Sequence, residues 1–178
     1  MPILSLKTGV KAMDVPRDHN ENYINATKEL IRADHLLYVS LKYSRTVDVI
    51  LSVVNRLVEA CKFGVIAAVE THYADEEELR KHMLGNATQI KAMVEAYPEA
   101  ADFIEHYKYL RKLNKSEPKQ RLNEFRRHVT LVTDIDGKEV RVKIEDLTSY
   151  YERVKEFLKF VNKNIHSEDM DDLLSQKN

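Results

Sequence analysis

Residues 46–73 form a run that, wound into a helix, would be apolar on nearly every side. The run is rich in β-branched residues, as buried strands are, but its length and its interspersed polar residues favour a helix. A helix of this kind lies at the centre of its fold or in a subunit interface, and both alternatives are open at this point. Its apolar residues are Val47, Val49, Ile50, Leu51, Val53, Val54, Leu57, Val58, Cys61, Phe63, Val65, Ile66 and Val69.

Helical periodicity continues through most of the remaining chain, where apolar side chains recur at three- and four-residue steps. Ser44 or Thr46, Asp75 and Asp146 stand where helices need an N-terminal cap. Besides 46–73, the predicted helices are 22–43, 75–97 with a break at 85, one that begins at 98, 116–127, and 146–165.

A β-hairpin is predicted around Asp136-Gly137, because both positions of a tight two-residue turn favour residues that tolerate positive φ. Folding about that turn places the apolar residues of both arms on one face. A slip of one residue would scramble that face, so the pattern fixes the register. The predicted pairs are Thr133 with Val140, Leu131 with Val142, and Val129 with Ile144.

These elements predict a mainly α fold, a helical bundle of five to six helices with one antiparallel β-hairpin at about 129–144 before the last helix. We expect an irregular N-terminal arm over 1–19, a single helical domain with its hairpin over 20–165, and an acidic, disordered tail over 166–178.

The sequence predicts a cytoplasmic protein without membrane association. No apolar run approaches the length of about 18 residues that a membrane-spanning helix needs, and the first residues lack a secretory signal. Cys61 is the one cysteine, so it has no intrachain disulfide partner and is expected to be a small buried residue.

Several kinds of active site are excluded by spacing. The four glycines are each more than 20 residues apart, so they cannot build a glycine-rich phosphate loop. The histidines form no His-x-x-x-His pair, and we expect neither a metal site nor a cofactor. No Gly-x-Ser-x-Gly elbow is present either.

The segment from His106 to His128 is strongly basic, with eight Lys or Arg residues against two acids in a chain of net charge −1. Such a cluster, interleaved with aromatic residues, could neutralise phosphates of RNA or of another phosphate-bearing ligand. Alternatively, its cations pair with acids elsewhere in the chain. The anion-binding candidates are Lys108, Arg111, Lys112, Lys115, Lys119, Arg126 and Arg127.

Arg121 and His128 are the candidate catalytic residues in this segment. If one helix carries both, their separation of seven residues returns them to the same face, two turns apart. An arginine that holds a phosphate beside a histidine that acts as general acid or base is suited to metal-independent RNA cleavage.

The chain resembles the HEPN superfamily of small helical domains, many of which are dimeric, metal-independent ribonucleases. The resemblance lies in the helical pair over 23–73, including His35-Leu36-Leu37-Tyr38-Val39-Ser40-Leu41, and in an Arg-x(4–6)-His motif met by Arg121 to His128. It implies a homodimer whose two Arg121/His128 pairs face one cleft. A symmetric interface would then cover the spare apolar face of the 46–73 helix.

Two functions follow as hypotheses. The first is binding of RNA or another phosphate-bearing ligand through 106–128, with RNA cleavage by Arg121 and His128. The second, which the lack of a strong catalytic motif favours, is a non-catalytic dimeric module that binds another protein.

Overall fold

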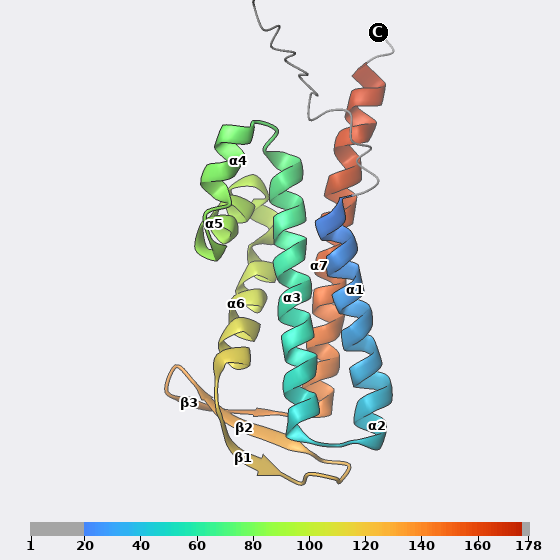
Figure 1. Ribbon diagram of the computed structural model, residues 1–178, viewed down its shortest axis with the longest axis vertical. Coiled ribbons are helices and arrows are strands. Elements are labelled where there is room, and N and C mark those ends of the chain that lie inside the picture. The colour runs from blue at the N-terminus through green and yellow to red at the C-terminus, as the bar shows by residue number, and fades with distance from the viewer. Residues whose placement is uncertain (1–19, 176–178) are drawn as a thin grey trace, which may run out of the picture.

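The computed structural model describes residues 20–175, with side chains described for residues 20–166 (Figure 1). The predicted mainly α bundle with antiparallel strands before the last helix is confirmed. The elements are α1 (Glu21–His35), the π-helical turn η2 (Leu36–Ser40), α2 (Leu41–Tyr43), α3 (Val47–His72), α4 (Glu76–His82), α5 (Asn86–Ala96), the 3-10 turn η3 (Pro98–Ala100), α6 (Ala101–Lys115), β1 (Pro118–Leu122), β2 (Thr130–Ile135), β3 (Lys138–Val142) and α7 (Ile144–Ser175).

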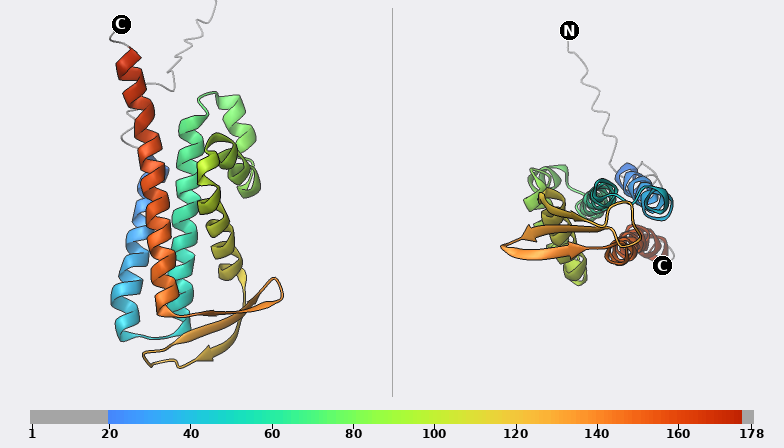
Figure 2. Two further views of the ribbon diagram at one scale, coloured as in Figure 1. Left: turned by 180° about the vertical axis from the view of Figure 1, so that it is seen from behind. Right: turned by 90° about the horizontal axis from the view of Figure 1, so that it is seen from below.

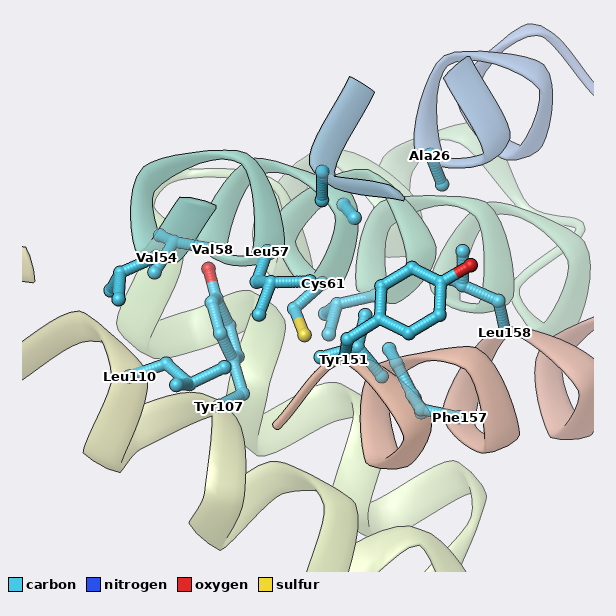
Figure 3. Packing of buried hydrophobic residues seen from close by; sticks show 14 of the residues in the cluster. Ala26, Val54, Leu57, Val58, Cys61, Tyr107, Leu110, Tyr151, Phe157 and Leu158 are labelled. Atoms are coloured by element: carbon cyan, nitrogen blue, oxygen red, sulfur yellow. The ribbon is translucent and has the colours of Figure 1, made fainter. Parts of the chain in front are cut away.

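The central helix is α3, which contacts α1, α5, α6 and α7. Figure 3 shows its side chains Leu57, Val58 and Cys61 among Tyr107 of α6 and Phe157 of α7. Of the two alternatives for this apolar helix, the centre of the fold is therefore the one that the structure supports, because helices of the same chain surround it. A partner subunit is therefore not needed to cover the apolar faces of α3.

Gly64 lets α3 and α7 approach each other closely. A Cβ atom at this position would lie 2.8 Å from Leu158 Cδ2 and 3.0 Å from Phe157 Cε1. Both distances are shorter than ordinary van der Waals contact, so a larger residue at this position would displace side chains of α7.

The predicted caps of α3 and α4 are present. Thr46 Oγ1 accepts the N–H of Val49 at 3.4 Å, so Thr46 and not Ser44 caps α3. Asp75 Oδ1 accepts the N–H of Glu78 at 2.8 Å. Each cap satisfies a backbone donor that has no partner inside its helix.

The hairpin between β2 and β3 has the predicted register. Leu131 pairs with Val142 and Thr133 with Val140, and Asp136 and Gly137 both have positive φ. The third predicted pair, Val129 with Ile144, is not part of the ladder, because β3 ends at Val142 and α7 begins at Ile144.

The helix predicted over 116–127 is wrong, because residues 118–122 form strand β1 instead. This strand pairs antiparallel with β2, so the hairpin is extended to the sheet order β1-β2-β3. A hairpin of two strands is marginal in water and leaves the backbone groups of both edges unpaired. Pairing with β2 satisfies one edge, and this gain outweighs the weak local preference of a short segment that begins with Pro118.

The sheet lies across one end of the helical bundle (Figures 1 and 2), which we call the base. Helices α3 and α6 contact β2 there, and α2 ends and α7 begins at the same end of the bundle. No helix within residues 20–175 is long and apolar enough to cross a membrane.

The last helix is longer than predicted. It was expected to end near Ile165, yet the backbone continues as α7 to Ser175, through most of the segment 166–178 that was predicted as a tail. The predicted N-terminal arm, 1–19, and the last residues, 176–178, lie outside the described residues.

Candidate functional site

The basic segment 106–128 is divided in the structure between α6, β1 and the loop between β1 and β2. On α6, three of its four cations have local partners. Lys108 Nζ lies 2.7 Å from Glu105, and Lys112 Nζ lies 2.6 Å from Asp136. The Arg111 guanidinium lies over the Tyr107 ring, 5.7 Å from its centroid. The alternative that neighbouring acids neutralise these charges therefore applies to Lys108 and Lys112.

The cations of β1 are also paired. Lys119 forms an ion pair with Asp134 of β2. Arg121 lies 3.0 Å from Asp48 on α3 and 3.6 Å from Glu124 in the following loop. The hydrogen bond with Asp48 raises the pKa of Arg121 above its ordinary value. Its guanidinium is thus engaged by two carboxylates.

Arg121 and His128 do not lie on one helix, so the predicted alignment two turns apart is wrong. Arg121 belongs to β1, and His128 lies in the loop just before β2. The His128 carbonyl accepts hydrogen bonds from Thr130 Oγ1 at 2.9 Å and Asn123 Nδ2 at 3.4 Å. Among residues 20–166, nothing forms a hydrogen bond or ion pair with the exposed His128 imidazole.

The loop of residues 123–129 is attached to the connection between α2 and α3. The Phe125 N–H donates to the Arg45 carbonyl at 2.7 Å. Glu124 Oε1 accepts the N–H of Val47 at 3.0 Å, at the first residue of α3. A carboxylate is favourable there because the N-terminal end of a helix carries partial positive charge. These bonds hold two segments, far apart in the sequence, side by side at the base.

This attachment brings four cations to one junction, which we call the basal basic surface: Lys42, Arg45, Arg126 and Arg127. The first two belong to α2 and the α2–α3 connection, and the other two to the β1–β2 loop. Within residues 20–166, none of the four forms a salt bridge. Lys115, at the end of α6, likewise has none there but lies at the negative end of that helix.

A hollow of about 290 Å³ lies at this junction. Lys42, Arg45 and Arg127 contribute three cations to its lining, and Glu145 contributes one acid. The apolar part of the lining consists of Leu37, Tyr38, Leu41 and Ile144. The hollow therefore combines a surplus of positive charge with an apolar surface, an arrangement suited to an anion that carries a flat or apolar group.

The site in the structure differs from the predicted one in its members. Arg126 and Arg127 were predicted, whereas Lys42 and Arg45 were missed. The signal for them was two cations in the short connection between two long helices, but nothing local indicates that residues about 80 positions later join them.

The remaining candidates for reactive groups are the thiol of Cys61 and clusters of metal-binding side chains. Cys61 is buried in the core, where burial raises the pKa of its thiol. Its predicted role as a small buried residue is confirmed. Among the residues that the structure describes, no three His, Cys, Asp or Glu side chains are grouped closely enough to hold a metal ion.

Comparison with known proteins returned no match to a family model, to a curated protein or to a solved structure. The resemblance to the HEPN superfamily stays a prediction from the sequence.

Proposed function

We propose that this protein binds RNA through phosphate groups that lie against the basal basic surface. The supporting observation is the contrast in pairing: Lys108, Lys112, Lys119 and Arg121 have carboxylate partners, whereas the four basal cations have none within residues 20–166. Like charges that outnumber the nearby acids repel one another, and a polyanion removes that repulsion as it releases its counterions.

The hollow gives this surface a place for one phosphate group. Lys42, Arg45 and Arg127 line it from two segments, so a phosphate there would interact with both sides of the junction. Arginine is well suited to this contact because its planar guanidinium can donate two parallel hydrogen bonds to phosphate oxygens. Such contacts are independent of base sequence.

The test is the affinity for a labelled RNA oligonucleotide, measured by fluorescence anisotropy at low salt. The double variant Lys42→Ala/Arg127→Ala should weaken binding by about tenfold or more, because each lost phosphate contact removes a counterion-release contribution. Lys108→Ala/Lys112→Ala is the matched control, since it removes the same charge from paired positions. Equal losses in both variants, or no binding by the unaltered protein, would reject the proposal. Binding of inorganic phosphate without binding of RNA would reject it as well.

Cleavage of RNA by Arg121 and His128 is a separate hypothesis that comes from the sequence. It requires the Arg121 guanidinium to leave Asp48 and Glu124 before it can hold a phosphate. His128→Ala tests it in a ribonuclease assay with purified protein. Unchanged cleavage would reject a catalytic role for His128, whereas binding through the basal basic surface would be unaffected by that result.

The second candidate function is a dimeric module that binds another protein. The observation that favours it is a row of exposed apolar side chains, Ile24, Ile31 and Tyr38, at seven-residue intervals along α1 and η2. Sedimentation of the unaltered protein and of Ile31→Glu at several concentrations tests this candidate. A dimer that the substitution dissociates would support it, and a monomer in both cases would reject the dimeric module.

A further inference from the structure

Phe125 is exposed in a backbone conformation that a bulky residue rarely adopts. Its φ is 63°, in the left-handed region, and 78% of its surface is exposed. Left-handed backbone costs free energy for any residue with a Cβ, and glycine would meet the geometry of this loop without that cost. Nor does the ring contribute to the core. A residue that both strains the backbone and exposes apolar surface indicates a functional constraint.

Tyr43 is a second exposed ring at the same junction. It ends α2, two residues before Arg45, and 81% of its surface is exposed. The hydrogen bond from the Phe125 N–H to the Arg45 carbonyl holds the two backbone segments together. Within residues 20–166, neither ring makes an aromatic contact or hydrogen bond with another side chain. Both rings are therefore available to a ligand.

Each ring is adjacent in the sequence to the basal cations of its own segment. Tyr43 lies between Lys42 and Arg45 in the sequence, and Phe125 directly precedes Arg126 and Arg127. Cations that follow a phosphate backbone beside aromatic rings that stack on bases are the combination that binds single strands, because every base offers a flat face. A duplex keeps its bases stacked inside and offers the same surface only its phosphates.

We infer that the basal basic surface binds single-stranded RNA, with bases stacked on Phe125 and Tyr43. This inference rests on the proposed function, since the phosphate contacts must form for the rings to reach the bases. It adds a preference that the cations alone do not provide: single strand over duplex, without dependence on base sequence.

The experiment compares a labelled single-stranded RNA with a duplex of the same sequence, both titrated with the full chain. The unaltered protein should bind the single strand more tightly. Phe125→Gly and Tyr43→Ala should each weaken single-strand binding by about 5- to 100-fold, as loss of one stacked base does, and leave duplex binding unchanged. Leu84→Ala is the matched control, because Leu84 is also 81% exposed but lies between α4 and α5.

A thermal unfolding curve separates loss of binding from loss of folding. Phe125→Gly should melt at or above the temperature of the unaltered protein, because glycine relieves the left-handed strain. Equal affinity for single strand and duplex, or unchanged single-strand affinity in both ring variants, would overturn the inference. If Lys42→Ala/Arg127→Ala still weakened binding in that case, the proposed function would stand. Absence of binding to either RNA would overturn both.

Discussion

Around α3, apolar side chains fill the space between helices, whereas the base carries four cations without salt bridges among residues 20–166 and two exposed aromatic rings, beside a hollow. In the first region each residue choice serves packing. Gly64 allows a close approach of two helices, and Glu29, buried beside Arg56, has its carboxylate 3.0 Å from the guanidinium. In the second region the choices oppose stability, since Phe125 is strained and Lys42, Arg45, Arg126 and Arg127 repel one another.

This difference indicates which part of the molecule is adapted for function. Natural proteins accept local destabilisation where binding or catalysis requires it. Substitutions in the interior should therefore change stability and leave the ligand affinity of the folded protein alone. Substitutions of the basal cations and of the two exposed rings should change affinity and cost little stability, or even add to it.

The largest expected effect is that of Phe157→Ala in the interior. Phe157 is 2% exposed, on α7, and contacts the Phe103 ring at a centroid distance of 5.6 Å. Removing its ring should lower the free energy of unfolding by about 3–5 kcal/mol, measured by urea titration. RNA affinity of the remaining folded protein should be unchanged. A large fall in affinity would mean that the interior and the base are not separable.

Gly64→Ala should have the next largest effect. The added Cβ would meet Leu158 at 2.8 Å, which forces α3 and α7 apart or their side chains into poor rotamers. We expect a loss of about 1–3 kcal/mol in the same titration. Gly85→Ala is the control, since no atom lies within 4 Å of a Cβ there. A stability loss as large in the control would contradict the close approach of the two helices.

Glu124→Ala tests the attachment between the two segments at the base. It removes the acceptor for the Val47 N–H and one partner of Arg121, so we expect a loss of about 1 kcal/mol of stability. RNA affinity should also fall, because the hydrogen bond from Phe125 to Arg45 alone then holds Arg126 and Arg127 beside Arg45. Glu117→Ala, which removes the same charge from an exposed side chain, is the control. Affinity that rises equally in both variants would show that charge, and not the attachment, governs binding.

The smallest predicted effect concerns the pH dependence of the free energy of unfolding, through His106. Burial, with a further contribution from Arg153 on α7, lowers the pKa of His106, and its buried Nε2 has no hydrogen-bond partner. The folded state therefore holds the imidazole neutral while the unfolded chain takes up a proton as the pH falls through about 6.5. Stability should decrease between about pH 7 and 5, since the unfolded state binds more protons there.

His106→Gln should make that decrease smaller, as followed by urea titration at each pH. His128→Gln is the control, because the His128 side chain is exposed. An unchanged pH dependence in His106→Gln would show that other groups cause the acid sensitivity.

The parts of the fold that sequence patterns predicted are those with local causes. The helices follow from periodicity and caps such as Thr46, and the hairpin follows from Asp136-Gly137. Strand β1 was missed because its one cause is nonlocal: it pairs with β2, and three of its five residues are exposed, so no alternating pattern marks it.

The site could be predicted only in part for the same reason. The sequence shows that residues 106–128 are basic, but not which charges are already paired. Asp48, which holds Arg121, is 73 residues away from it in the sequence. Lys42 and Arg45 join the site through the hydrogen bond from Phe125 to Arg45, which no local pattern encodes.

The most direct test of the account is the salt dependence of RNA binding in two fourfold variants. Removing Lys42, Arg45, Arg126 and Arg127 by alanine substitution should reduce the slope of log affinity against log salt concentration by about 3, since each phosphate contact on a single strand contributes about 0.7. Removing Lys108, Arg111, Lys112 and Lys119 takes away the same charge from partnered positions and should change the slope by less than about 1. Equal slopes in the two variants would contradict the claim that the unpaired cations at the base are the ones that bind phosphate.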